Sequence, residues 1–272
     1  MLENHEHSTV PKSENLLNCD NQQGKRLSYV IGVYFGDGYV SLNYGGTKTK
    51  YFRLNVIDED FRDYAAQCCE IAFPDYHVTR FHSVVKERDY YGLQIRGIGN
   101  YIESITGGKR FIPNFVYESD ENMKAFIEGM VDSKGWVTMR SVKNIIQAKL
   151  GFAITSEVIH ELCKMLGRVG VKYGKIGTYT KCRKRALKNI SINIPSFLAA
   201  GMKFHIQRKQ EKLDKFSLIM DLIGNGHKHR RSFREQNPDL IKRMVCSDLC
   251  SDAKKMAEMS ISAIQQQGMF GE

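Results

Sequence analysis

Two short segments of the chain place chemically different residues at the same position before a glycine. In the first segment, 29–38, Asp37 precedes the final glycine, and in the second, 126–135, Lys134 takes that place. Both segments have the composition of a short helix that stops at a glycine. A helix dipole disfavours a carboxylate at the carboxyl end, so a bound cation at Asp37 would offset the repulsion. The ammonium group of Lys134 cannot ligate a metal ion and would repel one.

Each segment also carries a glycine in the middle of the expected helix, Gly32 in the first and Gly129 in the second. A glycine inside a helix costs roughly 1 kcal/mol relative to alanine. Two helices that approach backbone to backbone would offset this cost, and the small residues Gly36 and Ser133 follow on the same faces. The sequence therefore predicts a directly packed helix pair. The alternative is that these glycines are tolerated by accident. It would explain a glycine in one segment, but it explains two glycines at matching positions less well.

The two segments begin two copies of one larger unit. The final glycines are 97 residues apart (135 − 38), as are the expected helix N-caps Asp58 and Thr155 and the strand ends Ile95 and Ile192. Each copy has the order helix, two strands, helix, two strands, helix. The expected strands and helices after the first motif are 52–56, 58–73, 77–84, 89–96 and 98–105, and those after the second are 149–153, 155–167, 171–179, 186–194 and 195–201.

The repeat predicts an α+β pseudo-dimer in which each half has a four-stranded antiparallel sheet backed by helices. The predicted divisions are a polar, flexible arm at 1–24, a first repeat at 25–117, a second repeat at 118–222 and a carboxy-terminal extension at 223–272.

The first segment resembles the LAGLIDADG motif, and the second, Gly-Met-Val-Asp-Ser-Lys-Gly at 129–135, resembles its partner copy. The chain is thus similar to the single-chain, two-motif LAGLIDADG homing endonucleases over about residues 26–222. The resemblance implies paired helices that end above DNA and two sheets that form a saddle over the major groove. It also implies that Asp37 binds the catalytic divalent metal, Mg²⁺ or another cation such as Mn²⁺ or Ca²⁺, whereas Asp132 matches an earlier, non-catalytic acid.

Lys134 departs from the family pattern at the second catalytic acid. Asp132 is a poor substitute, because two residues along a helix turn a side chain by roughly 200° to another face. Two-metal hydrolysis needs carboxylates at both the attacking and the leaving oxygen. Three interpretations remain open: the chain nicks one strand with Asp37, it binds DNA without cutting, or Lys134 is an introduced inactivating change.

Phosphodiester hydrolysis also needs a cation or proton donor near the developing charge. Similar family members carry a lysine between the last strand-helix unit and the following helix of each half. The resemblance places this lysine at Lys209, within 207–213, and more loosely at Lys109, within 107–113. The alternative for both is a solvated lysine at a helix end.

The expected strands alternate between apolar and polar side chains, as half-buried strands do. Their polar faces are rich in arginine, asparagine and glutamine, which make paired hydrogen bonds with guanine and adenine edges. The basic run 181–185 suits phosphate contacts. The candidate DNA-binding residues are Arg53, Asn55, Arg80, His82, Gln94, Arg96, Arg140, Lys149, Lys172, Lys175, Arg183, Arg185, Asn189, Ser191 and Asn193.

The bulk composition agrees with a polyanion partner. The 272 residues carry a formal net charge of +10, which attracts nucleic acid at long range, although ribosomal and membrane-surface proteins can be equally basic. The seven scattered cysteines do not resemble a disulfide framework. No apolar run approaches the roughly 18 residues of a membrane span, and the polar, acidic start is unlike a secretory signal. We expect a soluble, intracellular protein of a bacterial or phage-infected cytoplasm or of an organelle.

The carboxy-terminal extension has a different character from the repeats. A basic linker at 224–231 precedes two expected helices, 238–246 and 252–259, and the beginning of a third. The pattern resembles a helix-turn-helix with a turn about one residue short, and the alternative is a helical tail on the core. His227, His229, Cys246 and Cys250 could bind zinc, but their spacing is not that of a standard site.

The leading hypothesis is therefore a metal-dependent, site-specific double-stranded DNA endonuclease of the homing type. It would act as a monomer on a long, asymmetric target and be encoded in an intron or a free-standing gene. The alternative is a non-catalytic DNA- or RNA-binding protein on the same scaffold, either an intron maturase or a transcriptional regulator.

Overall fold

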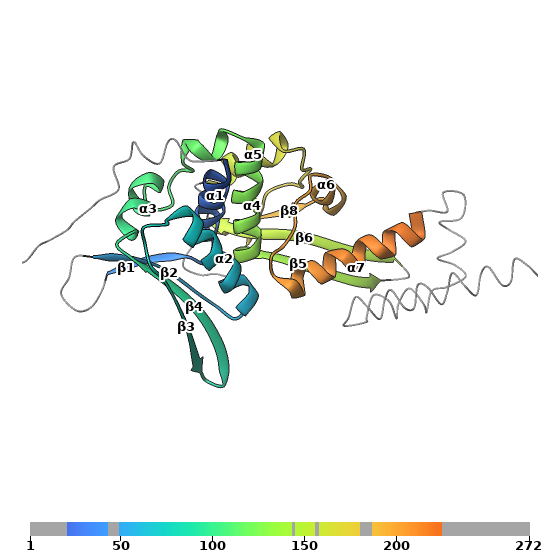
Figure 1. The fold of residues 1–272 in the computed structure, drawn as a ribbon. Coiled ribbons are helices and arrows are strands. Elements are labelled where there is room, and N and C mark those ends of the chain that lie inside the picture. Colours follow the sequence, from blue (N-terminus) through green and yellow to red (C-terminus); the bar gives the residue numbers. More distant parts are fainter. Residues whose placement is uncertain (1–20, 43–48, 143–144, 156–157, 180–186, 225–272) are drawn as a thin grey trace, which may run out of the picture. The chain divides into compact units, whose positions relative to one another are not determined.

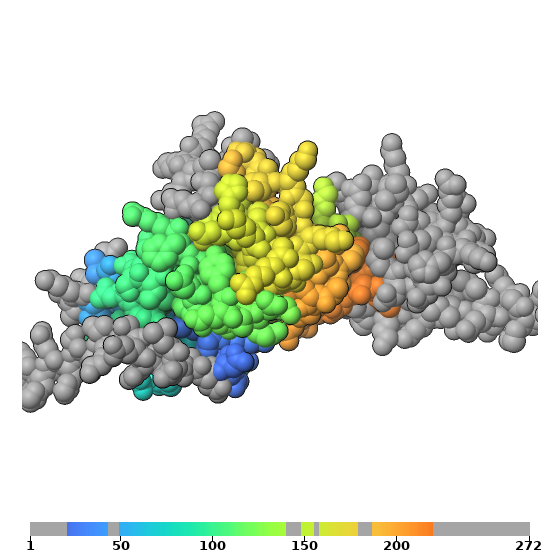
Figure 2. All heavy atoms as spheres, turned by 90° about the horizontal axis from the view of Figure 1, so that it is seen from above, coloured from blue at the N-terminus to red at the C-terminus, as the bar shows by residue number. Residues whose placement is uncertain are grey.

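The computed structural model describes residues 21–42, 49–142, 145–155, 158–179 and 187–224, and the remaining residues are grey in Figure 1 and Figure 2. The chain divides into two compact units. One comprises the residues up to Ser133 with Ser156–Val169, and the other comprises Lys134–Thr155 with the residues from Gly170 onward. These units follow packing rather than the repeat, so the repeat boundaries at 25–117 and 118–222 stay a prediction.

The described residues form seven α-helices, one short 3-10 helix and eight strands in two antiparallel sheets (Figure 1). The first copy contains α1 (Asn21–Phe35), β1 (Tyr39–Leu42), β2 (Lys50–Val56), α2 (Glu59–Ala72), β3 (Val78–Val85), β4 (Arg88–Arg96) and α3 (Gly99–Thr106), followed by the 3-10 helix η1 (Asn114–Tyr117). The second copy contains α4 (Asp120–Lys134), β5 (Gly135–Val142), β6 (Ile145–Thr155), α5 (Ile159–Arg168), β7 (Gly177–Tyr179), β8 (Leu187–Ile192), α6 (Ile194–Ala199) and α7 (Gln207–Gly224).

Both sheets have the same topology, β1-β2-β4-β3 in one and β5-β6-β8-β7 in the other. This confirms the predicted α+β fold with its duplicated order of elements. Strand β6 is displaced by one residue from the 97-residue repeat. Ile95 and Ile192 are 97 residues apart (192 − 95), whereas their partners in register, Phe52 and Leu150, are 98 residues apart (150 − 52). The saddle over DNA stays a prediction.

Alternating apolar side chains fix which face of each sheet enters the core. In the first sheet, Phe52 and Leu54 of β2 and Leu93 and Ile95 of β4 are buried, and α2 and α3 contact these strands. In the second sheet the equivalent buried side chains are Leu150, Phe152, Ile154, Ile190 and Ile192. Each buried methylene group contributes about 0.8 kcal/mol by its removal from water, so a register slip of one residue would be strongly unfavourable.

Three predicted boundaries were wrong. Helix α1 begins at Asn21, so the predicted arm at 1–24 overlaps it, and Gln23 donates a hydrogen bond to the carbonyl of Ala72. Thr155 ends β6 instead of capping α5, whose N-cap residue is Val158. The strand expected at 171–179 is only Gly177–Tyr179, preceded by an isolated bridge from Tyr173.

Several predictions fall on residues outside those described. They are the extension from 225 onward, including its helices and zinc candidates, the basic run 181–185, and most of the amino-terminal arm. Within the described part of the chain, no helix combines the length and apolar character needed to cross a membrane.

Candidate nucleic-acid interface

The motif helices α1 and α4 pack backbone to backbone through their central glycines. A Cβ atom built on Gly32 would lie 2.1 Å from the carbonyl oxygen of Phe126, and one on Gly129 would lie 2.3 Å from that of Tyr29. Real Cβ atoms essentially never approach within 3.0 Å of such an atom. Only glycine therefore permits this separation, and the predicted helix pair is confirmed for this part of the chain.

The contacts between α1 and α4 are related to one another by the repeat offset. The hydroxyl of Tyr29 donates a buried 2.8 Å hydrogen bond to Asp132, and the rings of Phe126 and Phe35 meet edge to face with centroids 5.6 Å apart. Adding 97 to Tyr29 gives Phe126, and adding 97 to Phe35 gives Asp132. A local pseudo-twofold axis thus exchanges a polar contact with an aromatic one.

The polar contact is held in a dry environment. Tyr29 and Asp132 are each 1% exposed, and burial followed by the nearby carboxylate raises the pKa of the Tyr29 hydroxyl well above its usual value. Tyr29 therefore remains a protonated donor at any physiological pH. The burial of Asp132 agrees with its interpretation as a non-catalytic acid.

Asp37 lies in the turn that follows α1. The Gly38 amide donates to the carbonyl of Val33 at 2.9 Å, which closes the turn, and the Asp37 side chain is half-buried. At the same end of the helix pair, a Cβ on Gly36 would lie 2.2 Å from the Cβ of Ser133. Asp37 and Lys134 are thus the residues that directly follow a close contact between the two helix ends.

Lys109 reaches the turn that contains Asp37. Its Nζ atom donates a 2.8 Å hydrogen bond to the carbonyl of Gly38 and lies 4.7 Å from the ring centroid of Tyr34. Lys109 has a φ of 75°, in the left-handed region that non-glycine residues rarely adopt. The loop at 107–109 thus directs the lysine back toward the end of α1, and a solvated helix-end lysine does not describe it.

The other two candidate residues at the predicted catalytic centre lie at the ends of helices. Lys209, in the first turn of α7, is 7% exposed, and its ammonium lies 5.6 Å from the ring centroid of Phe204. Lys134 is the last residue of α4 and is exposed. Their catalytic roles stay predictions.

Asp37 is the predicted ligand of a divalent metal ion. Among the described residues, no three side chains of His, Cys, Asp or Glu lie close enough to hold a metal ion together. Magnesium commonly takes one or two protein carboxylates and completes its shell with substrate phosphates and water. The single carboxylate of Asp37 fits that mode of binding.

The first sheet has a polar face opposite the core. Register pairs Arg53 with Gln94 and Tyr51 with Arg96, which places all four on this face with Asn55. The complete set from the described strands is Tyr39, Ser41, Tyr51, Arg53, Asn55, Thr79, Phe81, Ser83, Val85, Arg88, Tyr90, Gly92, Gln94 and Arg96. No carboxylate occurs in this set.

Two polar atoms on this face have unmet hydrogen-bonding capacity. Arg53 stacks its guanidinium over the Tyr51 ring at 5.0 Å, and its Nε atom has no partner among the described residues, nor does the hydroxyl of Ser41. Buried donors without partners are uncommon in native proteins.

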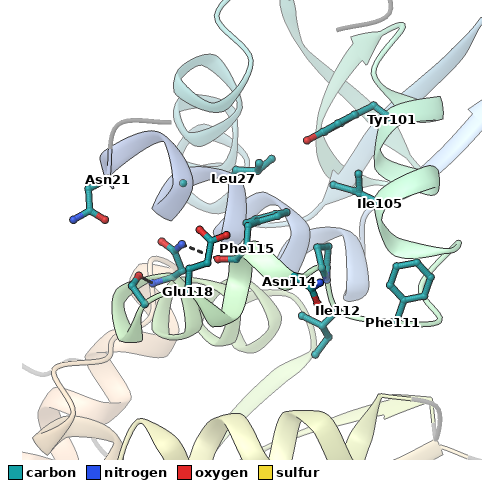
Figure 3. A pocket seen from close by; sticks show the side chains of 13 residues that line it. Asn21, Leu27, Tyr101, Ile105, Phe111, Ile112, Asn114, Phe115 and Glu118 are labelled. Atoms are coloured by element: carbon teal, nitrogen blue, oxygen red, sulfur yellow. Dashed lines mark hydrogen bonds between the residues drawn. The ribbon is translucent and has the colours of Figure 1, made fainter. Parts of the chain in front are cut away.

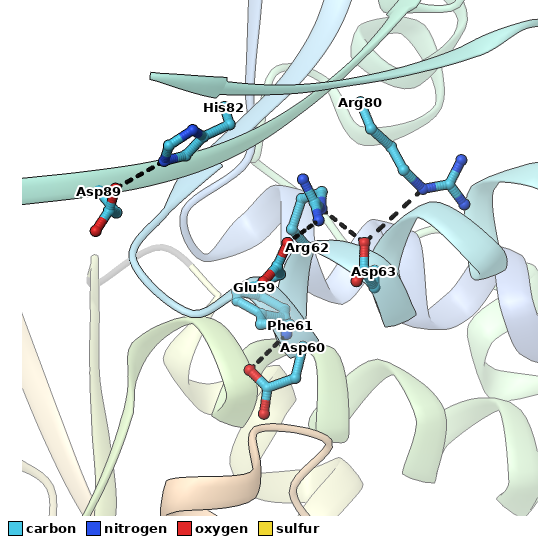
Figure 4. Close-up of polar contacts among 8 residues, drawn as sticks. All are labelled: Glu59, Asp60, Phe61, Arg62, Asp63, Arg80, His82 and Asp89. Carbon is cyan, nitrogen blue, oxygen red and sulfur yellow. Dashed lines mark hydrogen bonds and ion pairs between the residues drawn. The ribbon is translucent and has the colours of Figure 1, made fainter. Parts of the chain in front are cut away.

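Arg80 and His82 lie on the opposite face from Arg53. Arg80 pairs in register with the buried Leu93 and forms an ion pair with Glu70 of α2 at 2.6 Å. It also lies 3.9 Å from Asp63 of α2, as Figure 4 shows. His82 contacts Asp89 at 2.8 Å on the same hairpin. Their DNA-binding assignment stays a prediction, but they do not belong to the face that Arg53 and Gln94 share.

The candidates in the second unit occupy several structural positions. Lys149, Asn189 and Ser191 share the face opposite Leu150 and Ile190, and the Asn189 side-chain oxygen has no partner among the described residues. Lys172 and Lys175 are exposed in the segment before β7. Arg140 pairs in register with Gln147, and Arg183 and Arg185 fall outside the described residues.

Asn193 has a structural role that its sequence position did not suggest. Its side chain accepts a 2.9 Å hydrogen bond from the Ser196 amide and caps α6, whose first turn contains Pro195. Arg88 was not among the residues predicted from the sequence, and the alternation from Gln94 through Tyr90 places it on the polar face. The position of Asn193 just before a helix turn that contains proline is typical of an N-cap. Arg88 lies an even number of positions from Gln94 along β4, which predicts the same face.

Comparisons with known proteins found matches at low sequence identity. No family model matches the sequence. An uncharacterized protein of Methanocaldococcus jannaschii is 24% identical over 233 residues, which cover 74% of this chain and 75% of that protein.

Solved structures that are similar to the chain include the following three. I-DmoI in complex with DNA and Ca has a TM-score of 0.48 and 14% identity, covering 73% of this chain and 99% of that chain. The LAGLIDADG homing endonuclease I-GzeII in complex with a DNA target has a TM-score of 0.47 and 10% identity, covering 79% and 96%. Full-length DUF199/WhiA from Thermatoga maritima has a TM-score of 0.43 and 12% identity, covering 93% and 96%.

Proposed function

We propose that this chain is a site-specific DNA endonuclease of the LAGLIDADG homing type that cuts one strand of its target. The observation that carries the proposal is the glycine-mediated pairing of α1 and α4, with contacts related by the 97-residue repeat (126 − 29). Such a pair brings the ends of two motif helices together, which is the arrangement that the motif serves in this family. Monomeric action on a long, asymmetric duplex follows from two unlike halves in one chain.

The polar faces of the sheets support double-stranded DNA as the partner. The first sheet's polar face carries three arginines, Arg53, Arg88 and Arg96, with asparagine and glutamine and without carboxylates in the described strands. Arginine reads guanine and asparagine or glutamine reads adenine in the major groove. The net charge of +10 adds a sequence-independent attraction to phosphate.

Asp37 and Lys109 supply complementary groups in one half. The Asp37 carboxylate would hold a divalent cation, Mg²⁺ or a substitute such as Mn²⁺ or Ca²⁺, jointly with phosphate oxygens of the DNA. When bound, such an ion polarises the phosphate and lowers the pKa of a coordinated water. The Lys109 ammonium is held at the turn by its hydrogen bond to the Gly38 carbonyl. There it would stabilise negative charge on the phosphate during cleavage.

Lys134 limits the second half. Its ammonium occupies the position that carries an acid in the family motif, and it cannot ligate a cation. A duplex bound across both halves would therefore meet one competent acid. The alternative function is a non-catalytic binder, an intron maturase or a transcriptional regulator, and Lys134 is the observation that favours it.

The test begins by selecting bound duplexes from a randomised DNA library, because the target sequence is unknown. The selected duplex is labelled on each strand separately. It is then incubated with Mg²⁺ and one of four proteins: the unmodified full chain or the single variant Asp37→Asn, Lys109→Met or Lys134→Asp. Denaturing gels then report each strand independently. We expect the full chain to cut one strand, Asp37→Asn to bind without cutting, Lys109→Met to cut more slowly, and Lys134→Asp to cut both strands.

Two results would decide against nicking. Selective binding without cleavage by either the full chain or Lys134→Asp would establish the non-catalytic alternative. Cleavage by Asp37→Asn at the same rate as the unmodified chain would remove Asp37 from the mechanism. Failure to select any duplex would contradict the DNA-binding proposal itself.

A further inference from the structure

The first unit contains a cavity whose lining does not include the residues proposed to cut DNA. It has a volume of about 560 Å³ and lies among the first turns of α1, helix α3, the segment 111–118 and the start of α4 (Figure 3). This volume is within the range of small-molecule sites, roughly 300–1,000 Å³. The cavity does not depend on the proposed nuclease function.

Most of the cavity wall is apolar. Leu27, Ile105 and Ile112 contribute aliphatic surface, and Tyr101 and Phe115 contribute aromatic rings. Figure 3 shows these side chains arranged around a common space. Apolar walls with a small number of placed polar groups are typical of sites that bind small organic molecules.

Asn122 supplies a polar atom that the surrounding protein does not satisfy. The residue is 6% exposed and lines the cavity, and its side-chain oxygen is buried without a hydrogen-bond partner among the described residues. Its Nδ2 atom donates to the carbonyl of Phe115 at 2.9 Å, and its backbone amide donates to Ser119 Oγ at 3.1 Å. The Nδ2 bond fixes the orientation of the side-chain amide, so Oδ1 is the atom left for a ligand.

Gly24 of α1 packs against the side-chain amide of Asn122. A Cβ atom built on Gly24 would lie 3.6 Å from Nδ2 and 3.8 Å from Oδ1, which is ordinary van der Waals contact. Buried polar atoms in native proteins almost always have a partner, and an exception calls for an explanation. A ligand with a donor supplies one here.

We propose that this cavity binds a small, uncharged, flat heteroaromatic molecule that donates one N–H or O–H hydrogen bond to Asn122 Oδ1. The aromatic side chains favour a flat ring through edge and stacking contacts. The only charged group among the described lining residues is the exposed carboxylate of Glu118 at the rim, which disfavours anions. A neutral ring with one donor meets all three conditions.

The test compares two probes that differ in one hydrogen-bond donor. Indole has a ring N–H, whereas 1-methylindole has the same ring without it. Both are titrated into the full chain and followed by amide chemical shifts around the cavity. A net hydrogen bond of about 1 kcal/mol corresponds to about fivefold in affinity. We expect indole to bind at least about fivefold more tightly than 1-methylindole.

Two variants make the comparison specific to the cavity. Asn122→Leu keeps the side chain's size but cannot accept a hydrogen bond, so the two probes should bind it equally. Ile105→Trp fills the cavity, so both probes should lose measurable binding. The probe comparison on the unmodified chain stands even if a variant fails to fold.

Three outcomes would overturn the proposal. They are equal affinity of the two probes for the unmodified chain, no saturable binding of indole up to its solubility, and indole binding only after residues 1–20 are removed. The last would assign the cavity to the segment preceding α1 instead of to a small molecule.

Discussion

The packing of α1 against α4 predicts a large penalty for a single methyl group. In the Gly32→Ala variant, the new Cβ would sit 2.1 Å from the carbonyl oxygen of Phe126, whereas ordinary contact begins at 3.4 Å. The two backbones must therefore separate locally by about 1.3 Å. Because the opposing atom is a helix carbonyl and not the end of a flexible side chain, the adjustment moves a helix segment.

Two opposing energies set the magnitude. Overpacking of a well-packed interior costs about 1–3 kcal/mol or more, and alanine recovers roughly 1 kcal/mol of helix propensity over glycine. Separation also weakens the Tyr29–Asp132 hydrogen bond and the Phe35–Phe126 contact on either side. We expect a net loss of about 2 kcal/mol in the free energy of unfolding. For a protein of this size that lowers Tm by about 4–8 °C.

The assay is urea denaturation followed by circular dichroism, with Tm as a second measurement. Gly24→Ala is the matched control, because Gly24 lies in the same helix and its added Cβ would meet Asn122 at an ordinary 3.6 Å. The control should match the unmodified chain or gain up to about 1 kcal/mol. Equal stability of Gly32→Ala and Gly24→Ala would refute the close approach of the two helices.

Three further predictions concern buried and paired groups. Tyr29→Phe should lose about 1–2 kcal/mol in urea denaturation because buried Asp132 loses a donor, and an unchanged midpoint would contradict this. Burial raises the pKa of the Cys68 thiol to about 12. Iodoacetamide at about pH 8 should therefore label it far more slowly in the folded chain than in urea, as measured by mass spectrometry; equal rates would exclude this. The hydrogen bond from the Lys25 ammonium lowers the pKa of the Glu121 carboxyl in the folded chain. The pair therefore stabilises the folded chain at pH values above the pKa of unfolded Glu121, and this stabilisation is lost as the pH falls through the pKa of folded Glu121. Lys25→Met should lower the free energy of unfolding by at most about 0.5 kcal/mol near pH 7 and leave it unchanged near about pH 2. A larger loss at acid pH than at pH 7 would contradict this prediction.

The helix pair was accessible from the sequence because its signal is local and occurs twice. Gly32 and Gly129 each carry a propensity cost that only close packing offsets, and their matched spacing excludes coincidence. The order of strands and helices followed from the same repeat. Element ends were less accessible, since Thr155 has the side chain of an N-cap but continues β6 through its pairing with Leu187.

The facing of β3 could not be derived from alternation alone. Alternation shows that Arg80 and His82 share a face, but Val78 is the only fully buried side chain in that strand. The face on which Arg80 lies is defined by its register with Leu93 of β4 and by its ion pair with Glu70 of α2. Both partners belong to other elements of the fold. Long-range pairing decides such cases, and a single strand contains little information about it.

Lys109 and the cavity share a different obstacle. The left-handed backbone at Lys109 follows two glycines, and its direction depends on the turn after α1, 71 residues away. The cavity walls come from four separate segments. Neither feature has a periodic signature, so each emerges only after the first unit is packed.

The exchange of a polar contact for an aromatic one across the α1–α4 axis makes the two motif helices non-interchangeable. Two copies of α4 paired in this way would bury two Asp132 carboxylates against Phe126 rings, and two copies of α1 would leave Tyr29 hydroxyls facing Phe35 without an acceptor. Only unlike partners satisfy both sides. If the halves were expressed as separate polypeptides, we therefore expect them to form mixed pairs in preference to pairs of like halves.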